Sequence, residues 1–392
     1  MHILTVTTFF PNAAGRQRAV FIRSLTDELK LLVDGVSVIA PIPSRLPFAD
    51  GGKNSVVPTH ENIGGIDVYH PRFLALPKLE IFSGITYLFT IIRTLNCLKK
   101  KYKGLVVHGH RIYPDGLAVV LAARLLGIPV VVTAHGSDIN RTAQRFGMKC
   151  QVRYALKHAR AVIAVSSALR EKMRRIVDVS IDQIPCAGYS PKIFYPIKQQ
   201  EARQRLGLGA NVGKVVLYVG SMERLKGVEL LLDAWQQLHE CSALDDNDKL
   251  VFAGDGSRLQ SLKKKAQKTL PKERVHFCGS ISHDQMPLWI NAANTLCLPS
   301  YMEGTPNVII ESLACAVPVV ATAVGGIPAV IKHDENGLLI APDNCDELAN
   351  ALVKVLSMRW SQDVLVDSVR DYTWAHLARR NYEVMRRVVG AD

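Results

Sequence analysis

The feature that most limits the fold is an alternation of short apolar runs with amphipathic helical segments, which occurs twice along the chain. In the first half, apolar runs at 3–10, 36–40 and 130–134 are separated by segments with helical spacing of apolar residues. This alternation predicts the α/β class, with parallel sheets covered by helices on both faces. The second half repeats it, with predicted strands at 215–219, 250–253, 275–278, 295–298, 319–321 and 338–340.

A segment without periodicity separates the two halves. Residues 189–196 contain two prolines and read as a linker. We therefore predict two Rossmann-like, doubly wound domains at 1–195 and 196–373, followed by a basic amphipathic helix within 374–392. A chain of 392 residues suits two domains, because single cores rarely exceed about 250–300 residues. Ligands of such domains are expected at the carboxyl ends of the strands, in a cleft between the two halves.

The net positive charge of the chain is confined to its first half. Residues 1–200 hold 27 Lys and Arg against 12 Asp and Glu, whereas residues 201–392 hold 21 against 23. This asymmetry predicts an anionic partner for the first half: a membrane surface, a nucleic acid or a phosphorylated acceptor. Because no nucleic-acid-binding motif accompanies the charge, nucleic acid is the least favoured.

Cysteine usage and hydropathy predict a cytoplasmic protein. The eight cysteines are scattered without a C-x-x-C pair, so we expect them to be reduced. The N-terminal residues read as a buried strand rather than a signal peptide. The longest apolar run, 81–92, has 12 residues, which is too short to span a bilayer.

A lysine cluster follows that apolar segment. Lys99, Lys100, Lys101 and Lys103 come directly after residues 79–98. An apolar face beside lysines predicts peripheral contact with an anionic membrane or a lipid-linked acceptor, on the inner face of the plasma membrane. An ordinary cross-over helix with a solvated basic end is the alternative.

The most informative polar motif spans residues 299–311 and follows the predicted strand 295–298. A strand, a Gly/Thr turn and a helix start present free N–H groups that bind phosphate or sugar hydroxyls. Glu303 and Glu311 stand on either side of that turn, so they could hold two groups of one elongated polyhydroxyl ligand. Taken alone, this spacing also fits two solvated carboxylates.

Other predicted strands end in polar loops as well. After 215–219 come Gly220, Arg224 and Lys226, whose cations suit a diphosphate, although the Walker A pattern is absent. After 250–253 comes Gly254-Asp-Gly, which lacks the third glycine of the dinucleotide fingerprint, so NAD is weakly supported. The residues after 275–278 suit the wall of a base site.

In the first half, His135 follows the predicted strand 130–134 and could donate a hydrogen bond into the cleft. His108 and His110 end the preceding strand. No ligand spacing supports a metal site built from these histidines, so no metal is expected. Asp246-Asn-Asp248 has a D-x-D pattern but precedes a strand, and we interpret it as a solvated turn.

Taken together, the ordered motifs of the second half resemble those of a retaining glycosyltransferase of family 4 with the GT-B fold. The motifs that carry the resemblance are Gly220…Arg224-x-Lys226-Gly227, Gly254-Asp255-Gly256, Glu303-x7-Glu311, Gly325-Gly326-Ile327-Pro328 and Asn336-Gly337-Leu338-Leu339. The resemblance implies that the second domain binds a nucleotide-sugar donor, that the first binds the acceptor, and that the last helix crosses back onto the first domain.

The resemblance also implies roles for individual residues. Arg224 and Lys226 would contact the diphosphate, and Glu311 would hold the ribose. Glu303 would face the sugar, and His135 would lie at the reacting sugar. The remaining donor-binding positions implied are those of the base site and of the sugar and distal phosphate: Gly279, Ile281, Gly304, Thr305, Pro306, Asn307 and Val308.

One loop departs from the family pattern. Family members often carry a Gly-Gly or similar loop after the first strand, close to the donor phosphate, whereas here the loop 11–19 offers only Gly15. Gly15 is therefore the candidate phosphate contact in this loop. Arg16 or Arg18 could supply phosphate or acceptor contacts instead.

The expected reaction moves a glycosyl group from a nucleoside diphosphate to an acceptor hydroxyl with retention, and without a metal or other cofactor. A UDP-sugar is favoured over a GDP-sugar, and the acceptor is expected to be a lipid-linked or cell-envelope polysaccharide precursor. Two alternatives share the same cleft: a GT-B phosphorylase, for which no cofactor lysine is evident, and a nucleotide-sugar epimerase.

Overall fold

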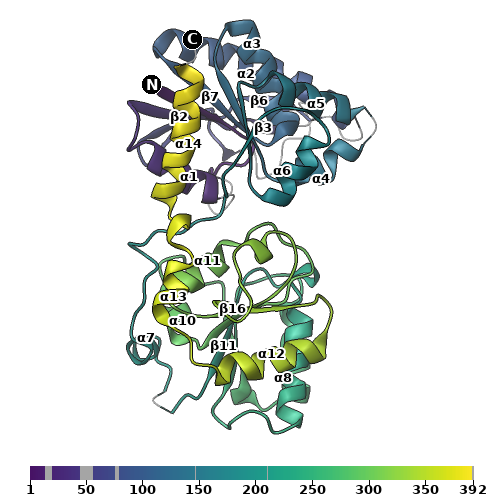
Figure 1. The fold of residues 1–392 in the computed structure, drawn as a ribbon, viewed down its shortest axis with the longest axis vertical. Coiled ribbons are helices and arrows are strands. Elements are labelled where there is room, and N and C mark those ends of the chain that lie inside the picture. Colours follow the sequence, from purple (N-terminus) through teal and green to yellow (C-terminus); the bar gives the residue numbers. More distant parts are fainter. Residues whose placement is uncertain (14–19, 45–55, 76–78, 146, 210, 391–392) are drawn as a thin grey trace. The chain divides into compact units, whose positions relative to one another are not determined.

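The computed structural model describes residues 1–13, 20–44, 56–75, 79–145, 147–209 and 211–390. Its contacts divide the chain into two compact units (Figure 1). Unit 1 comprises Met1–Cys186 with Trp374–Asp392, and unit 2 comprises Ala187–Thr373. The division falls at 186/187 rather than at the predicted residue 195, because Ala187, Tyr189 and Phe194 are buried in the core of unit 2 despite the neighbouring prolines.

Unit 1 is built on a largely parallel sheet. Its strands are β1 (His2–Val6), β2 (Gly35–Ile39), β4 (His60–Ile63), β5 (Ile66–Tyr69), β7 (Leu105–His110), β8 (Val130–Ala134), β9 (Ala161–Ala164) and β10 (Ile181–Gln183). Their order is β10-β9-β8-β7-β1-β2-β5-β4, and only β4 runs antiparallel to its neighbour. The strands β2, β4 and β5 lie on one side of β1, and the later strands β7 to β10 lie on its other side. The strand order therefore reverses between β1 and β7, and open α/β sheets bind ligands at such a point. A separate parallel pair joins β3 (Ile42–Ser44) to β6 (Arg72–Leu74).

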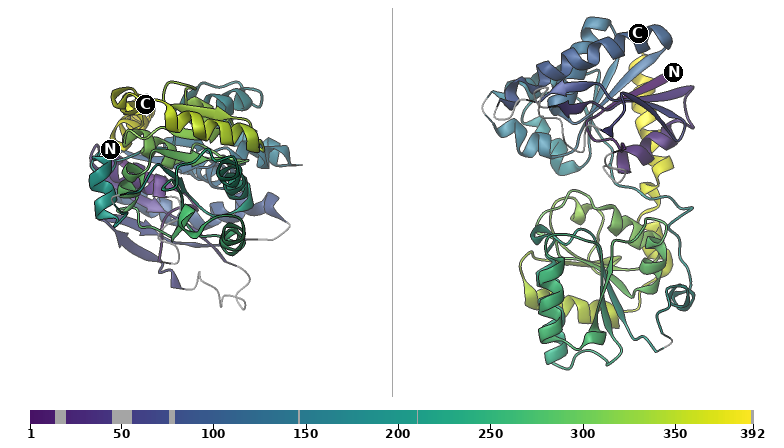
Figure 2. Two further views of the ribbon diagram at one scale, coloured as in Figure 1. Left: turned by 90° about the horizontal axis from the view of Figure 1, so that it is seen from below. Right: turned by 180° about the vertical axis from the view of Figure 1, so that it is seen from behind.

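Helices cover both faces of this sheet (Figure 2). They are α1 (Val20–Leu29), η2 (Glu80–Phe82), α2 (Ser83–Lys101), η3 (Ile112–Gly116), α3 (Leu117–Leu126), α4 (Ser137–Asn140), η4 (Thr142–Gln144), α5 (Met148–His158), α6 (Ser167–Arg174) and α14 (Trp374–Val389). Successive strand residues point to opposite faces. Accordingly, Ile3 packs with α1 and α14, whereas Leu4 packs in the core that contains α2 and α3.

The last helix belongs to unit 1 through a buried apolar stripe. Trp374, Leu377 and Met385 of α14 pack into the same cluster as Leu25 of α1. Figure 1 shows α14, in yellow, beside α1. The 3.6-residue spacing of the stripe accounts for the amphipathic pattern of this segment.

Unit 2 has a wholly parallel six-stranded sheet. Its strands are β11 (Val215–Val219), β12 (Lys249–Ala253), β13 (Val275–Gly279), β14 (Thr295–Leu298), β15 (Val319–Thr322) and β16 (Gly337–Ile340). The order is β13-β12-β11-β14-β15-β16, so it reverses between β11 and β14. All six lie within one or two residues of the predicted strands, because buried parallel strands read as continuous apolar runs.

Helices and 3-10 turns connect and flank the strands of unit 2. They are α7 (Gln199–Arg205), η5 (Arg224–Lys226), α8 (Val228–Glu240), α9 (Leu259–Thr269), η6 (Lys272–Arg274), α10 (Met286–Ala292), α11 (Asn307–Ala314), η7 (Ile327–Ala329), α12 (Cys345–Ser357), α13 (Gln362–Asp367) and η8 (Arg370–Tyr372). Between β15 and β16 the chain forms the 3-10 turn η7 rather than a longer helix. Asn336 explains why, since its side chain bonds the carbonyl of Val330 and the N–H of Lys332 and so ends the turn.

One helix in the described part of the chain, Glu80–Lys101, is long and apolar enough to cross a membrane by length and composition. This exceeds the 12-residue run counted from the sequence, because η2 and α2 continue beyond it at both ends. Of its most apolar window, 28% is buried. The residues buried on its inner face are Gly84, Tyr87, Ile91, Leu95 and Leu98, which leaves the outer face exposed.

The assignment of α14 to unit 1 predicts the effect of truncating its core residues. Met385 is fully buried, so Met385→Ala should lower the free energy of unfolding by about 2–5 kcal/mol through lost apolar burial and a residual cavity. The neighbouring Arg386 is exposed, so Arg386→Ala should change it by less than about 0.5 kcal/mol. Urea denaturation measures both. Equal midpoints for the two variants would contradict this packing.

Candidate functional site

The loops that follow β11 and β14 meet at the point where the strand order of unit 2 reverses. The ammonium group of Lys226, in the β11 loop, donates to Oε1 of Glu303, in the β14 loop, at 2.6 Å. Ser300 Oγ donates to the same carboxylate oxygen at 2.8 Å. The side chain of Glu303 is only 9% exposed, so this pairing compensates a largely desolvated charge. A cation and a carboxylate therefore face one another where such sheets bind ligands.

Backbone packing fixes the two loops against each other. The N–H of Tyr301 donates to the carbonyl of Leu225 at 2.9 Å. Gly227 has φ +66, and a Cβ there would lie 2.0 Å from the carbonyl oxygen of Pro299. Only glycine fits this contact, because the close approach leaves no space for a side chain and the conformation disfavours one.

Two further strand-end loops extend the same arrangement. A Cβ at Gly254, after β12, would lie 1.9 Å from the carbonyl oxygen of Gly220, after β11. A Cβ at Gly325, after β15, would lie 2.0 Å from the carbonyl oxygen of Glu303. Next to it, the N–H of Gly326 donates to the carbonyl of Gly304 at 2.7 Å. Glycines thus hold the Glu303 loop from both sides.

Arg224 occupies the exposed side of this site. Its side chain is exposed and forms no ion pair or hydrogen bond within the described residues. The preceding residue, Glu223, anchors the loop by accepting from the N–H and Oγ of Ser257 at 2.9 and 2.6 Å. Arg224 is consequently a cation on a fixed loop that is available to an anionic ligand.

The helix α11 begins directly after the Glu303 loop. Its N-cap is Pro306, so Asn307 and Val308 are its first residues, and their N–H groups have no intrahelical acceptor. Together with Thr305, they form the N–H cradle that the sequence predicts. The positive end of this eight-residue helix favours an anion at that position.

Glu311, in the second turn of α11, is 5% exposed. Burial raises the pKa of its carboxyl, and the neighbouring imidazole of His283 acts in the opposite direction. His283 Nε2 lies 3.5 Å from Glu311 Oε1, and this pairing raises the pKa of His283. The two glutamates of the motif thus have separate partners, Lys226 for Glu303 and His283 for Glu311.

The residues expected to form the base site lie at the end of β13. Gly279 has φ +71, and its carbonyl accepts from the N–H of Gly254 at 2.8 Å. Ile281 is half-buried against the core of unit 2. This edge adjoins the Gly254 loop, because β13 and β12 are neighbours.

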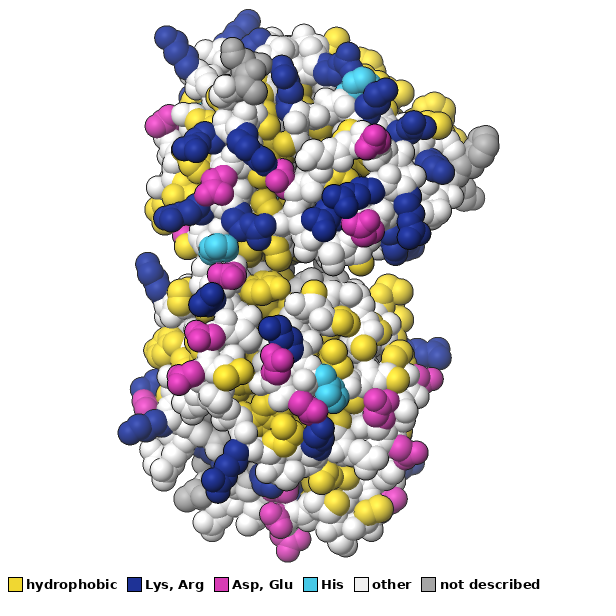
Figure 3. Space-filling model, in the orientation of Figure 1, with side chains coloured by type: hydrophobic (Ala, Val, Ile, Leu, Met, Phe, Trp, Pro, Cys, Tyr) yellow, Lys and Arg dark blue, Asp and Glu magenta, His cyan; other side chains and the backbone are white. Residues whose placement is uncertain are grey.

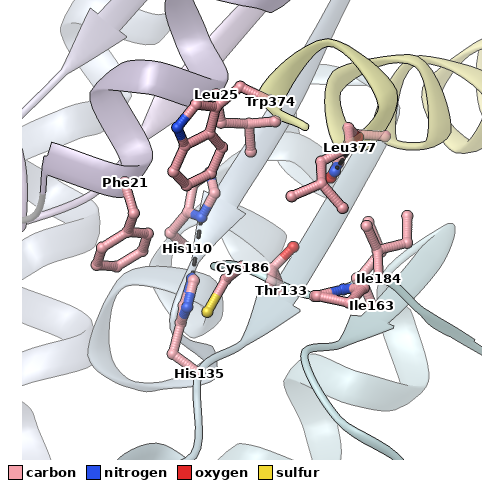
Figure 4. Close-up of a pocket in the computed structure, with 12 residues that line it drawn as sticks. Phe21, Leu25, His110, Thr133, His135, Ile163, Ile184, Cys186, Trp374 and Leu377 are labelled. Atoms are coloured by element: carbon pink, nitrogen blue, oxygen red, sulfur yellow. Dashed lines mark hydrogen bonds between the residues drawn. The ribbon is translucent and has the colours of Figure 1, made fainter. Parts of the chain in front are cut away.

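In unit 1, His135 follows β8 and faces His110, the last residue of β7 (Figure 4). Nδ1 of His110 lies 3.0 Å from Nε2 of His135. Burial lowers the pKa of His135 to about 4 and that of His110 well below its usual range, so both rings are neutral at pH 7. One ring must therefore donate its N–H to the other. Phe21 and Trp374 line the cavity around this pair.

His108 lies against His110, with ring centroids 4.1 Å apart, and its Nε2 bonds Thr133 Oγ1 at 2.7 Å. Within the described residues, no group of three or more His, Cys, Asp or Glu side chains is arranged to hold a metal ion. All eight cysteines are unpaired.

Arg111 directly follows β7, at the point of unit 1 where the strand order reverses between β1 and β7. Its backbone is strained, with φ 73 and ψ 133, a conformation that costs about 1–3 kcal/mol and occurs often at functional sites. Its guanidinium lies 4.7 Å from the centroid of the Phe9 ring. Sequence reasoning missed Arg111, because only the sheet order brings its position beside β1.

The other sequence-based candidates have mixed outcomes. Gly15 lies outside the described residues. The lysines at 99, 100, 101 and 103 are exposed at the end of α2 and just beyond it. The interpretation of Asp246-Asn-Asp248 as a solvated turn is wrong for Asp248, which is 3% exposed and accepts from the N–H groups of Lys214 and Asp245. It is a structural turn.

Three contributors to the site were not predicted individually: His283, Ser300 and Glu223. His283 follows the predicted base-site residues by two positions, and a histidine that close to a strand end was a usable signal. Ser300 and Glu223 carry no such signal, because serine and glutamate are common in exposed loops.

The Gly227 contact predicts a measurable steric penalty. Gly207 has nearly the same conformation, φ +67, but a Cβ there would meet nothing within 4 Å. Gly207→Ala should therefore cost only the backbone strain, about 1 kcal/mol, whereas Gly227→Ala should cost at least about 3 kcal/mol. Urea unfolding of the two variants isolates the difference. Equal stabilities would show that the loops are not in this contact.

Comparisons with known proteins agree with this architecture. Residues 19–187 match the model of the glycosyl transferase 4-like domain, and residues 199–371 match that of glycosyl transferases group 1. Among solved structures, the chain is similar to sucrose-phosphate synthase from Thermosynechococcus elongatus, with a TM-score of 0.74, 22% identity and full coverage of both chains. It is also similar to Anabaena HepE, with a TM-score of 0.71, 18% identity and coverage of 99% and 100%. These likenesses identify the GT-B fold.

Sequence relatives point the same way. The chain is 31% identical over 365 residues to TuaC of Bacillus subtilis, which is named as a teichuronic acid biosynthesis glycosyltransferase, and the match covers 90% of this chain and 89% of TuaC. It is 29% identical to the alpha-maltose-1-phosphate synthase of Mycolicibacterium smegmatis, over 81% and 87% of the two chains. The chain belongs to the family 4 glycosyltransferases, enzymes of the GT-B fold.

Proposed function

We propose that this glycosyltransferase uses a nucleoside-diphosphate sugar, with UDP as the favoured nucleotide, and transfers the sugar with retention of its anomeric configuration. The observation that carries the proposal is the pairing of Lys226 with Glu303 beside an unpaired Arg224 and the start of α11. Cations and free N–H groups suit a diphosphate, and a carboxylate suits sugar hydroxyls. The similar Anabaena HepE forms complexes with UDP and with UDP-glucose, which makes UDP the first nucleotide to test.

In the proposed reaction, the acceptor hydroxyl oxygen bonds to the anomeric carbon as the bond between that carbon and the diphosphate oxygen breaks. Negative charge develops on the leaving oxygen, which takes up the hydroxyl proton. Arg224, Lys226 and the N–H groups at the start of α11 would stabilise this charge without requiring a metal. Binding of the diphosphate would draw Lys226 from Glu303, which then becomes free to accept from a sugar hydroxyl. The diphosphate would thus replace Glu303 as the partner of Lys226, and a sugar hydroxyl would replace Lys226 as the partner of Glu303.

Retention would follow from departure and attack on the same face of the sugar. Glu303 already accepts from Lys226 and Ser300, an environment that favours hydrogen bonding over nucleophilic attack. His135 of unit 1 would contact the reacting sugar, and its neutral ring could donate one hydrogen bond there.

For the acceptor, we propose a lipid-linked or cell-envelope polysaccharide precursor, used at the cytoplasmic face of the membrane. The relationship to TuaC supports a polysaccharide pathway. The outer face of α2 supports peripheral membrane contact, because Phe82, Ile85 and Phe89 are exposed along one side and Arg93 and Lys100 continue the same stripe. Apolar side chains would enter the bilayer interface, and the cations would meet anionic headgroups.

The donor is best identified by screening UDP- and GDP-sugars with thermal shift and then measuring their hydrolysis without acceptor. A specific stabilisation followed by release of the nucleoside diphosphate supports the proposal. Epimerised sugar without release would instead indicate an epimerase. A sugar 1-phosphate formed from glycan and inorganic phosphate would indicate a phosphorylase.

The diphosphate assignment predicts the effect of Arg224→Ala. Turnover should fall by about 30- to 1,000-fold, corresponding to roughly 2–4 kcal/mol of transition-state stabilisation. The free energy of unfolding should change by less than about 0.5 kcal/mol, because Arg224 is exposed and makes no ion pair among the described residues. Lys264→Ala, an exposed lysine of α9, is the control and should retain full turnover. Wild-type turnover in Arg224→Ala would contradict the assignment.

The membrane assignment predicts salt-sensitive flotation with vesicles of phosphatidylglycerol and phosphatidylcholine. Phe89→Glu should reduce the captured fraction at least about fivefold, because it places a charge in the interfacial region. Leu31→Glu is a matched control, since Leu31 is 76% exposed and Phe89 is 73% exposed. If the wild-type protein stays in solution at low salt, α2 is not a membrane contact.

A further inference from the structure

A basic groove on unit 1 lies apart from all the residues assigned above. It is a cavity of about 330 Å³ between α4, η4, the start of α5 and the end of α6. Three cations line it: Lys149 of α5, Lys172 of α6 and Arg175 at the end of α6. Figure 3 shows Lys and Arg side chains gathered over the part of unit 1 where Figure 1 places α4 and α6.

The charges of these cations are not compensated by carboxylates. Lys172 Nζ donates to Oδ1 of Asn140, a neutral amide oxygen, at 2.8 Å. Over the ranges that the structure describes, neither Lys149 nor Arg175 has an ion-pair partner. The neighbouring Arg174 differs, because it pairs with Glu171 at 3.0 Å. Three like charges thus converge on one cavity, an arrangement that an anionic ligand would stabilise.

One helix end, the start of α5, adds to the positive potential. Lys149 lies in the first turn of α5, a turn without acidic residues, where the helix dipole disfavours a cation. Lys172 and Arg175 lie at the carboxyl end of α6, where the dipole favours cations and helps to hold them in place. The groove consequently combines the positive end of α5 with two cations, Lys172 and Arg175, that are held at the end of α6.

The rest of the lining identifies the kind of ligand. Ile139 and Ala143 are buried beneath the groove, and Ile176 is half-buried. Asn140 and Gln144 add amide groups that can bond hydroxyls. An apolar floor suits the C–H face of a sugar ring, amides suit its hydroxyls, and cations suit an acidic substituent.

We infer that this groove binds an acidic sugar residue of the acceptor glycan through its carboxylate or phosphate group. The inference rests on the proposed function, since it names the acceptor class of the same enzyme. A flat bilayer is a poorer fit, because its headgroups meet protruding side chains, such as those of α2, more readily than a cavity of single-sugar size. Asn140 of the groove belongs to α4, the helix that follows β8 and His135 in the chain.

The test compares two charge-reversal variants of the full chain by calorimetry. Lys172→Glu with Arg175→Glu alters the groove. Lys264→Glu with Lys268→Glu, both exposed on α9 of unit 2, makes the same change in net charge elsewhere. The ligands are glucuronate, inorganic phosphate and uncharged glucose, each titrated with saturating UDP present. UDP affinity is measured separately, so a failure of the donor assignment is seen independently.

The groove variant should bind glucuronate or phosphate at least about tenfold more weakly than wild type, and the α9 variant should stay within about twofold. Stronger binding of glucuronate identifies a carboxylate, and stronger binding of phosphate identifies a phosphorylated sugar. Equal affinity in wild type and groove variant, or equal losses in both variants, overturns the inference. The inference is also overturned if the groove variant is no longer captured by phosphatidylglycerol vesicles while its affinities for glucuronate and phosphate are unchanged. The groove would then be a lipid contact.

Discussion

The close approach of two backbones, at Gly227 and Pro299, is the constraint on which the donor half of the enzyme depends. The parallel order of unit 2 places β11 next to β14, so their following loops must share the same edge. Glycine at 227 allows the loops to touch, and Lys226 then reaches Glu303. Without that contact, the cation and the carboxylate would be two separate surface charges.

The arrangement also explains why the two glutamates of the motif differ. Glu303 lies in a loop held on one side by the β11 loop and on the other by Gly325 and Gly326. Glu311 lies inside α11, where burial raises its pKa and His283 is its partner. Glu303 thus has a cation partner that a bound diphosphate could draw away, whereas Glu311 lies within a helix beside His283.

Much of this could be predicted from the sequence, because it depends on local pattern. The strands of unit 2 are apolar runs bounded by glycines, and the polar loops after them were identified as the site. The Lys226–Glu303 pair could not be predicted, because 77 residues separate its members and only the sheet order brings them together. The same holds for Arg111 beside β1. The boundary was placed too late because prolines near 191 and 196 suggested a linker, although Tyr189 and Phe194 are buried.

The strand-end loops of unit 2 are proposed to bind the nucleoside diphosphate of the donor. A crystal structure of the protein with UDP tests it most directly. We expect diphosphate oxygens within hydrogen-bonding distance of Arg224 and Lys226, the ribose hydroxyls at Glu311, and the Lys226–Glu303 pair opened. UDP bound elsewhere, or bound with that pair intact and Arg224 still free, would contradict it.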